Sequence, residues 1–395
     1  MRRLDLASAQ IASNGTARRI NRDILLELIR YRQPISRVGL ARHSGLRPST
    51  VSEIVEQLLK EGWIREGALV RGPRGRPSVM LTINDAILTF ALDIRPDRTI
   101  IAVVDLAGRF LLRENIITLA DPKTSMARIV QRLSEIRLMY PHNRFEGIGV
   151  SVPGRVHPVT QELLLAPNLH WIGFDIKKAL ETGLGLQAEI DNDANACMLS
   201  ECWSGRLANV QHAVLVAVSE GIGAAILAGG QLHAGFNGLA GEFGHIQFDK
   251  DGPECGCGQR GCWEMFASSR AAVRNYQELS GSEAPLDVYA ILRLAENGDA
   301  TAHEAVARQA TALGRGLRLI MSTLSPELIL ITGEITSAWS RFGPIIQAEL
   351  EKSTLAGTAP RLATAGDGDS ARLHGATAVL LHSHAGYLHS YHHMN

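Results

Sequence analysis

No stretch of this 395-residue sequence stays apolar over the roughly 20 residues that a membrane-spanning helix requires. The N-terminus carries Arg2 and Arg3 but no continuous apolar core after them, which argues against a secretory signal. Cysteine is scarce, with five residues in all, and three of these fall between positions 255 and 262. Such clustering indicates a metal site in a reducing compartment rather than a disulfide framework, so we expect a cytoplasmic protein.

The sequence also has no net charge, because 40 Lys and Arg residues balance 40 Asp and Glu residues. The charge is unevenly spread, however: residues 1–84 hold 15 basic and 7 acidic side chains, and the remainder holds 25 and 33. A basic head on an acidic body is typical of a nucleic-acid-binding domain joined to a regulatory domain. On charge alone, a surface asymmetry without function is the alternative.

The basic head has the pattern of a helix-turn-helix. Residues 21–31 place apolar side chains on one helical face, and Ser36 is suited to cap a second helix that ends before Gly45. A third helix is expected from Pro48, since proline is favoured in a first helical turn. This order of elements predicts a helix-turn-helix with Val38 turned towards its core. A helical hairpin used for protein contacts is the alternative.

Two groups of side chains are placed to contact DNA. The N-terminal end of the third helix would enter the major groove, and small hydroxyl side chains there allow close approach to phosphates and bases. Two short apolar stretches then flank an arginine-rich loop, which predicts a β-wing suited to the minor groove. The predicted DNA-binding residues are Arg47, Ser49, Thr50, Ser52, Arg71, Arg74 and Arg76.

From residue 87 onwards the pattern changes to alternating strands and helices. Three successive strands are expected from LTFALDI, TIIAVVDL and RFLLRENII, followed by a helix near 125–139 and the strand EGIGVSVP. Later strands are expected at LQAEIDND, HAVLVAVS, AAILAGG and ELILITGE, with helices at 194–203, 268–279, 302–324 and 337–352. Three antiparallel strands and then alternating strands and helices, in two rounds, predict an α/β fold of two lobes around a cleft.

His245, Cys255, Cys257 and Cys262 carry the most specific chemical signal. Three thiolates and one imidazole form a closed tetrahedral ligand set, and soft thiolates favour zinc over magnesium or calcium. Because no ligand position remains open for water, we expect one structural zinc ion per chain rather than a hydrolytic metal. Reduced cysteines that lie close by chance are the alternative.

A second polar cluster, Asp191-Asn192-Asp193, stands at an expected strand-to-helix junction, where α/β proteins bind ligands. Asp193 is suited to accept a hydrogen bond from a sugar hydroxyl or to deprotonate it, and Glu242 and Glu264 add two acceptors. For any one of these acids a helix cap or a surface carboxylate is the more common role. Only the combination indicates a polyol site.

The motifs together resemble those of one family. SRVGLARHSGLRPSTVS in the head is followed by SVPG, PNLHW, DNDANA, SEGIG, LAGEFGH and CGCGQRGCWE. From residue 21 to about residue 382 the sequence is similar to the ROK family (repressors, open reading frames, kinases), specifically its repressor branch. The resemblance implies a winged helix-turn-helix over residues 1–84 and then the two-lobed actin-like (RNase H-like) α/β fold of ROK sugar kinases. We expect the first lobe to span 85–193, completed by 372–395, and the second to span 194–371.

The resemblance also implies that a sugar lies in the cleft between the lobes. Matched by motif, the sugar-binding residues would be Asn168, Asn192, Asp193, Glu242, His245 and Glu264. His245 would have two functions, with one ring nitrogen on zinc and the other towards the sugar. Asp193 matches the catalytic base of the kinases.

Both phosphate-binding loops depart from the pattern of the family's kinases. Where the kinases have an Asp-x-Gly-Gly-Thr turn, this sequence has Arg95 and Pro96, whose side chains and missing N–H group obstruct a phosphate. In the second loop, Glu220 brings a negative charge to the place where a triphosphate would bind. We therefore expect no enzyme activity, so Asp193 would not be catalytic.

The predicted function is a sugar-responsive repressor that binds operator DNA as a homodimer or a dimer of dimers. The alternative is an active ROK sugar kinase with an appended DNA-binding domain, which the two altered loops disfavour. A phosphotransferase protein as the effector, in place of a sugar or sugar derivative, is a third hypothesis that the resemblance allows.

Overall fold

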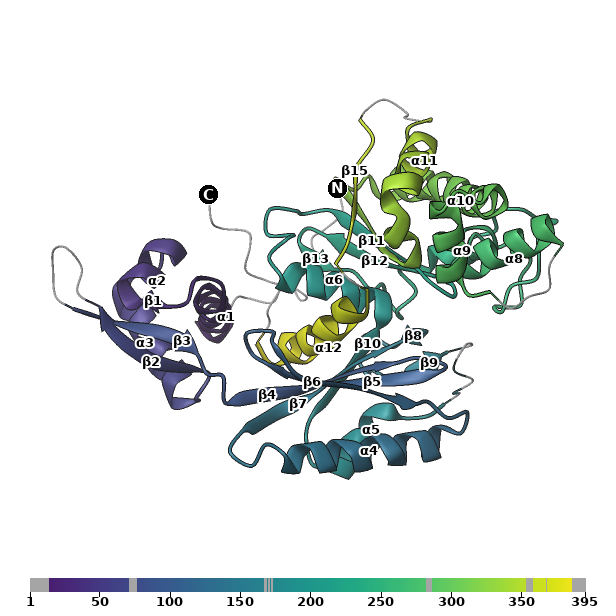
Figure 1. Ribbon diagram of the computed structural model, residues 1–395. Helices are drawn as coiled ribbons and strands as arrows, with labels where there is room; N and C mark the ends of the chain where they lie inside the picture. The colour runs from purple at the N-terminus through teal and green to yellow at the C-terminus, as the bar shows by residue number, and fades with distance from the viewer. Residues whose placement is uncertain are drawn as a thin grey trace, which may run out of the picture.

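The computed structural model describes residues 14–70, 77–166, 169, 171, 173–281, 286–352, 358–366 and 368–385, with side chains described between 18 and 381. Figure 1 shows a small N-terminal domain beside two α/β lobes that lie one above the other. Within the described ranges, no helix combines the length and the apolar character needed to cross a bilayer.

The N-terminal domain is a winged helix-turn-helix, as predicted. Its helices are α1 (Asn14–Arg32), α2 (Arg37–Ser44) and α3 (Pro48–Lys60), and its strands are β1 (Ile35–Ser36), β2 (Ile64–Val70) and β3 (Ser78–Ile83). The strands form one antiparallel sheet in the order β1-β3-β2. β2 and β3 are therefore the two sides of the wing.

Local signals explain the boundaries of α2. Ser36 Oγ accepts a hydrogen bond from Gly39 N at 3.1 Å and so caps the helix. Gly45 ends it with a φ of 69°, in the left-handed region that favours glycine. The prediction for Val38 was wrong, because its side chain is 65% exposed. α2 has only eight residues, and Leu40 is the one among them that is buried.

The first lobe is built on a five-stranded sheet of order β10-β7-β4-β5-β6. The strands are β4 (Ile87–Ile94), β5 (Arg98–Asp105), β6 (Phe110–Ile117), β7 (Arg144–Val152) and β10 (Ala188–Asn192), with a small hairpin of β8 (Arg155–Val156) and β9 (Leu163–Leu165). Helices α4 (Pro122–Leu138) and α5 (Ile176–Leu184) cover one face. The other face is covered by α12 (Gly368–Ala385), which arrives from the far end of the chain (Figure 1).

The second lobe is built on a five-stranded sheet of order β13-β12-β11-β14-β15. The strands are β11 (Ala213–Val218), β12 (Ile222–Ala228), β13 (Gln231–Leu232), β14 (Leu328–Gly333) and β15 (Arg361–Thr364). Its helices are α7 (Glu264–Ala267), α8 (Ser269–Ser280), α9 (Val288–Glu296), α10 (Ala300–Leu324) and α11 (Trp339–Glu351), with 3-10 turns η2 (Glu242–His245) and η3 (Glu334–Ala338).

The two sheets share one topology. In each, three antiparallel strands are followed by two parallel strands, and the first strand of the five lies in the centre. Such a repeated sheet is the actin-like (RNase H-like) arrangement, so the predicted fold is confirmed.

Helix α6 (Asp193–Trp203) follows β10 of the first sheet and packs against α12 and against β12 of the second sheet. Nine of its 11 residues are buried. Its C-terminal half also shares an apolar cluster with α1 of the N-terminal domain, which includes Leu25, Ile29, Leu199 and Trp203. α6 therefore contacts all three parts of the protein.

Candidate functional site

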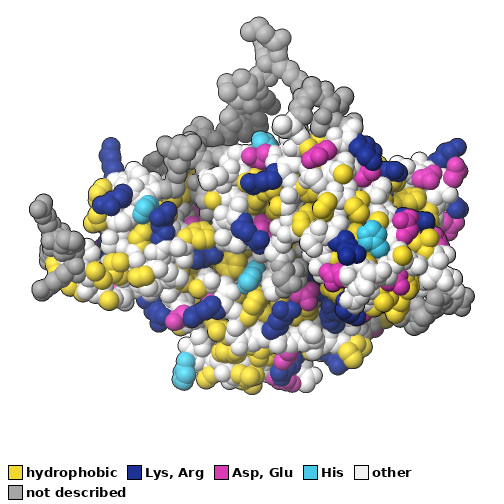
Figure 2. Space-filling view, turned by 45° about the horizontal axis from the view of Figure 1, so that its top comes forward, with side chains coloured by type: hydrophobic (Ala, Val, Ile, Leu, Met, Phe, Trp, Pro, Cys, Tyr) yellow, Lys and Arg dark blue, Asp and Glu magenta, His cyan; other side chains and the backbone are white. Residues whose placement is uncertain are grey.

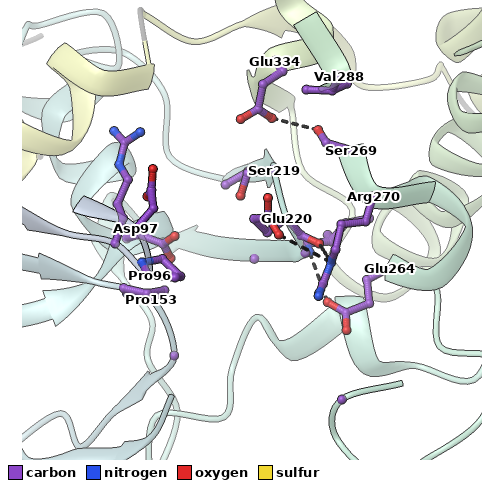
Figure 3. Close-up of a pocket in the computed structure, with 18 of the residues that line it drawn as sticks. Pro96, Asp97, Pro153, Ser219, Glu220, Glu264, Ser269, Arg270, Val288 and Glu334 are labelled. Atoms are coloured by element: carbon purple, nitrogen blue, oxygen red, sulfur yellow. Dashed lines mark hydrogen bonds and ion pairs between the residues drawn. The ribbon is translucent and has the colours of Figure 1, made fainter. Parts of the chain in front are cut away.

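A cavity of about 730 Å³ lies between the two lobes. The first lobe contributes the turn between β4 and β5 and the junction of β10 with α6, and the second contributes the turn between β11 and β12, η2 and α8. Figure 3 shows both walls, with Pro96, Asp97 and Pro153 on one side and Ser219, Glu220, Ser269, Arg270 and Glu334 on the other.

Asn192 and Asp193 stand at the junction where β10 ends and α6 begins. Asn192 Oδ1 accepts from Ala194 N at 2.8 Å, and Asn192 Nδ2 donates to Gly154 O at 2.6 Å. The amide of Asn192 is thus already used to cap α6 and to hold the adjacent turn. Burial raises the pKa of the Asp193 carboxyl group, and the nearby positive charge of Arg372 opposes this shift.

The turn held by Asn192 requires glycine. Gly154 has a φ of 108°, and a Cβ atom there would lie 2.2 Å from the carbonyl oxygen of Leu165. The β8–β9 hairpin can therefore approach the cavity only because this position lacks a side chain.

Three further polar side chains come from the second lobe, those of Glu242, His245 and Glu264. Glu242 and His245 lie at the ends of η2, and His245 Nε2 is 3.7 Å from Glu242 Oε2. The pKa of Glu242 is raised because its carboxyl group is buried, and the neighbouring His245 and Arg155 only partly offset this effect. Glu264 is 7% exposed and accepts a hydrogen bond from Ile222 N at 3.4 Å.

Five of the six predicted sugar-binding residues line this one cavity, although they come from distant parts of the sequence. They are Asn192, Asp193, Glu242, His245 and Glu264. The sixth, Asn168, lies outside the described residues. Because these five side chains line one cavity, they are placed so that they could all contact the same ligand. The role of each residue in sugar binding stays a prediction.

The four predicted metal ligands lie together beside the cavity. One donor atom from each of His245, Cys255, Cys257 and Cys262 lies within 4.8 Å of the others. Cys255 Sγ is 3.5 Å from His245 Nδ1, and Cys257 Sγ is 3.6 Å from Cys262 Sγ. Zinc–sulfur bonds of about 2.3 Å in a tetrahedron place two sulfurs about 3.8 Å apart, so the spacing fits zinc.

The geometry of His245 agrees with a double function. Nδ1 faces the cysteine sulfurs, whereas Nε2 faces Glu242 and the cavity. The loop that carries the cysteines is tight: a Cβ atom at Gly261 would lie 1.4 Å from the carbonyl oxygen of Asp249. A metal ion held here would brace the loop that presents Glu242 and Glu264 to the cavity.

Both residues that depart from the first phosphate loop of the kinases line the cavity, as does Glu220 from the second. Arg95 Nε donates to Asp93 Oδ2 at 2.7 Å, at the end of β4. On the opposite wall, Arg270 Nε donates to the carbonyl oxygen of Glu220 (Figure 3). The three residues that depart from the kinase loops thus lie on the walls of the same cavity as Asp193.

Sequence reasoning missed Asp369 and Arg372, which reach Arg95 and Asp93 from the first two turns of α12. No local motif marks these two residues. They come into the site only because α12 packs across the sheet of the first lobe. Arg372, for example, is 279 residues away from Asp93 in the sequence.

The N-terminal domain presents the predicted base-reading end of α3 to solvent. Arg47 and Ser49 are exposed, and Thr50 and Ser52 are partly exposed. Ser52 Oγ donates to Pro48 O at 2.9 Å, so this hydroxyl is engaged within the helix. Arg71, Arg74 and Arg76 lie outside the described residues. In Figure 2 the end of the molecule that holds this domain shows more Lys and Arg than Asp and Glu.

Comparison with known proteins supports the same division of the chain. The sequence model of the ROK family matches residues 89–383, and that of the MarR family matches residues 24–66. The chain is 30% identical to the xylose repressor of Bacillus subtilis (strain 168) over 329 residues, which covers 82% of this chain and 85% of that protein. It is 28% identical to the DNA-binding transcriptional dual regulator NagC of Escherichia coli (strain K12), covering 88% of each.

Solved structures show the same relationship. A ROK family transcriptional regulator, a homologue of the Escherichia coli MLC protein, superposes with a TM-score of 0.81 at 27% identity, covering 94% of this chain and 98% of that one. A ROK family glucokinase from Streptomyces griseus, in complex with glucose and AMPPNP, superposes with a TM-score of 0.66 at 27% identity and covers 73% of this chain and 97% of that one. The regulator therefore matches nearly the whole chain, whereas the kinase matches about three quarters of it.

Proposed function

Because this chain belongs to the ROK family, we propose that it is a sugar-responsive transcriptional repressor and not a kinase. One observation carries the proposal: a winged helix-turn-helix with an exposed Arg47 is joined to a cavity that is lined by five residues matching the family's sugar motifs, and by Arg95, Pro96 and Glu220 where the kinases' phosphate loops differ. The curated relatives described above are regulators of transcription, which supports the same conclusion.

In this proposal the cavity binds a sugar through Asn168, Asn192, Asp193, Glu242, His245 and Glu264. Carboxylates accept hydrogen bonds from sugar hydroxyls, and Asp193 binds without acting as a base, because no phosphoryl donor shares the site. Asn192 contributes mainly by holding the junction, since both ends of its amide are engaged.

The N-terminal domain would bind operator DNA. The N-terminal end of α3, with Arg47, Ser49, Thr50 and Ser52, would lie in the major groove, and Arg71, Arg74 and Arg76 of the wing would reach the minor groove. One such helix covers only a few base pairs, so we propose a homodimer or a dimer of dimers on a palindromic operator.

His245, Cys255, Cys257 and Cys262 would hold one structural zinc ion per chain. Zinc supplies four bonds that fix a short, glycine-rich loop, and this is its only contribution in the proposal. Reduced cysteine ligands and a DNA target would both suit a cytoplasmic protein.

Operator affinity measured by fluorescence anisotropy, with and without sugar, tests the proposal. A duplex selected by the protein from random sequences serves as the operator, and a sugar that binds should weaken its binding. Asp193→Ala should keep operator binding and lose the sugar response, whereas Glu304→Gln, an exposed acid of α10, should change neither. A protein whose operator affinity responds only to a phosphotransferase protein, and to no sugar, would contradict the choice of effector.

A further inference from the structure

The three cysteines among the predicted metal ligands differ in their access to solvent. Cys255 and Cys262 are 6% and 0% exposed, whereas Cys257 is an exposed residue. Burial protects a cysteine ligand from reagents in solution, and exposure makes a cysteine susceptible to oxidation. Among the three ligands, Cys257 alone lacks this protection.

The turn that carries Cys257 leaves it open to small molecules. Residues 256–260 are all exposed and form the tip of a short antiparallel turn. Glycine flanks Cys257 on both sides, and a Cβ atom added at Gly256 or Gly258 would meet no atom beyond the adjacent residues within 4 Å. Cys257 also lines the cavity between the two lobes. A small oxidant can therefore reach this cysteine from solvent.

A second thiol lies close to Cys257. Cys257 Sγ is 3.6 Å from Cys262 Sγ, and Cys262 is held in place by a β-bridge with Gln247. A disulfide requires a separation of about 2.05 Å, so the two sulfurs would have to approach by roughly 1.5 Å. The exposed turn that carries Cys257 has room for this movement. An exposed cysteine beside a second one is the usual arrangement of a redox-sensing pair.

Cys255 connects the metal ligands to the cavity. Its Sγ lies 2.9 Å from Glu264 Oε1 and 3.5 Å from His245 Nδ1. Glu264 and His245 both line the cavity between the lobes. A change that opened the cluster of cysteines would therefore also loosen two side chains of the cavity wall.

From these observations we propose that Cys257 is an oxidation site, and that peroxide joins it to Cys262 in a reversible disulfide with loss of the metal ion. The inference rests on the proposed function, since it takes zinc to be resident in the site. It adds a redox response to a metal site whose proposed role is structural.

The reaction proceeds in two steps. The sulfur of Cys257 attacks one oxygen of hydrogen peroxide, the O–O bond breaks, and a sulfenic acid and a hydroxide ion form. The sulfur of Cys262 then attacks the sulfenic sulfur, so that an S–S bond forms, the S–O bond breaks and a second hydroxide ion leaves. Both hydroxide ions take up protons and become water, and the two sulfurs supply the two electrons that reduce the peroxide. Only His245 and Cys255 then remain as ligands, which is too few for a structural zinc site.

Peroxide titration of the full-length protein, with its zinc content measured beforehand, tests the proposal. A chromogenic chelator reports the zinc released, and mass spectrometry after alkylation of the free thiols maps the disulfide. One zinc ion should be released for each pair of thiols lost, and the linked residues should be Cys257 and Cys262. The melting temperature should fall as in Cys257→Ser, and dithiothreitol with added zinc should restore it.

Two variants separate the exposed thiol from the metal. Cys257→His gives a set of two cysteines and two histidines, which also binds zinc. It should keep the metal and release it to peroxide at least about tenfold more slowly, because the exposed thiol is absent. Gln259→Ser changes an exposed side chain of the same turn and keeps every thiol, so it should match the wild type.

The outcomes distinguish this inference from the proposed zinc site. A disulfide that involves Cys255, or equally fast release from zinc-loaded Cys257→His, would overturn the inference. Wild-type protein that keeps its zinc and its thiols in about tenfold molar excess of peroxide would also overturn it. Protein purified without chelator that contains no zinc would contradict the proposed metal and the release step, and the disulfide map would still decide whether Cys257 and Cys262 form the oxidised pair.

Discussion

The guanidinium group of Arg30 in α1 lies 4.6 Å from the ring centre of Trp203, the last residue of α6. Arg30 and Tyr31 both donate hydrogen bonds to the carbonyl oxygen of Trp203. The first residue of the same helix is Asp193, which lines the cavity. One buried helix thus contacts the cavity at one end and the DNA-binding domain at the other.

Removing the contact between Arg30 and Trp203 is expected to reduce the effect of sugar binding on operator affinity. Arg30→Gln combined with Glu27→Gln removes the ion pair without leaving a lone buried carboxylate. The double variant should bind sugar and operator nearly as before, while the effect of sugar on operator affinity falls about fivefold, within the usual range of coupling energies. Arg32→Gln, an exposed residue of the same helix end, is the control. If sugar changes the operator affinity of the double variant as much as that of the wild type, α6 does not act on the DNA-binding domain through Arg30.

Zinc content should depend on Cys257. Cys257→Ser is expected to lose the metal and to lower the melting temperature, because a structural zinc site contributes on the order of 10 kcal/mol. Elemental analysis and thermal unfolding measure the two effects. Gln259→Ser changes an exposed side chain of the same loop and should keep both. Protein purified without chelator that contains no zinc would contradict the assignment.

We expect no phosphoryl transfer. Pro96 supplies no N–H group, Arg95 is held in ion pairs, and Glu220 adds a negative charge, so ATP has no phosphate site. Incubation with ATP, magnesium and a panel of hexoses and pentoses should yield no more sugar phosphate than the Asp193→Asn variant does. Turnover clearly above that background would restore the kinase hypothesis.

Operator binding should depend on salt and on Arg47. Arg47→Ala is expected to weaken binding, and each lost phosphate contact should reduce the slope of log K against log salt concentration by about 0.9. Anisotropy titrations between low and moderate salt measure the slope. Arg308→Ala removes a positive charge of equal size from α10, far from the N-terminal domain in sequence, and should leave the slope unchanged.

The free energy of unfolding should depend on pH through the carboxyl group of Asp191. Burial raises the pKa of this carboxyl group from 3.8 to about 6 in the folded protein. Between about pH 4 and 6 the folded state holds a proton that the unfolded state has released, so this group makes stability fall as the pH rises. Asp191→Asn keeps an acceptor for Asn195 Nδ2, which lies 2.8 Å from Asp191 Oδ1.

The Asp191→Asn variant should therefore gain stability relative to the wild type from pH 4 to 6, and the difference should level off above that range. Urea unfolding at a series of pH values measures the free energy of each protein. A difference that shrinks as the pH rises would have the wrong sign for a buried carboxyl group and would refute the assignment.

Several features of this protein were determined by the sequence itself, because they arise from neighbouring residues. Ser36 caps α2 through an N–H group only three residues away, and Gly45 ends the same helix. The four metal ligands all fall between 245 and 262, so their spacing indicated a common site before any fold was known. The alternation of strands and helices likewise predicted two α/β lobes.

Only the tertiary structure decided how the distant parts meet. The resemblance led us to expect that residues 372–395 complete the first lobe, but no helix was predicted there, and only the packing of α12 across the first sheet brings Asp369 and Arg372 to Arg95 and Asp93. The two ends of α6 acquire their functions in the same way, since Asp193 faces the cavity and Trp203 meets Arg30. Charges and aromatic rings act over a few ångströms of space, whatever their separation along the chain, so a local pattern could not reveal these pairs.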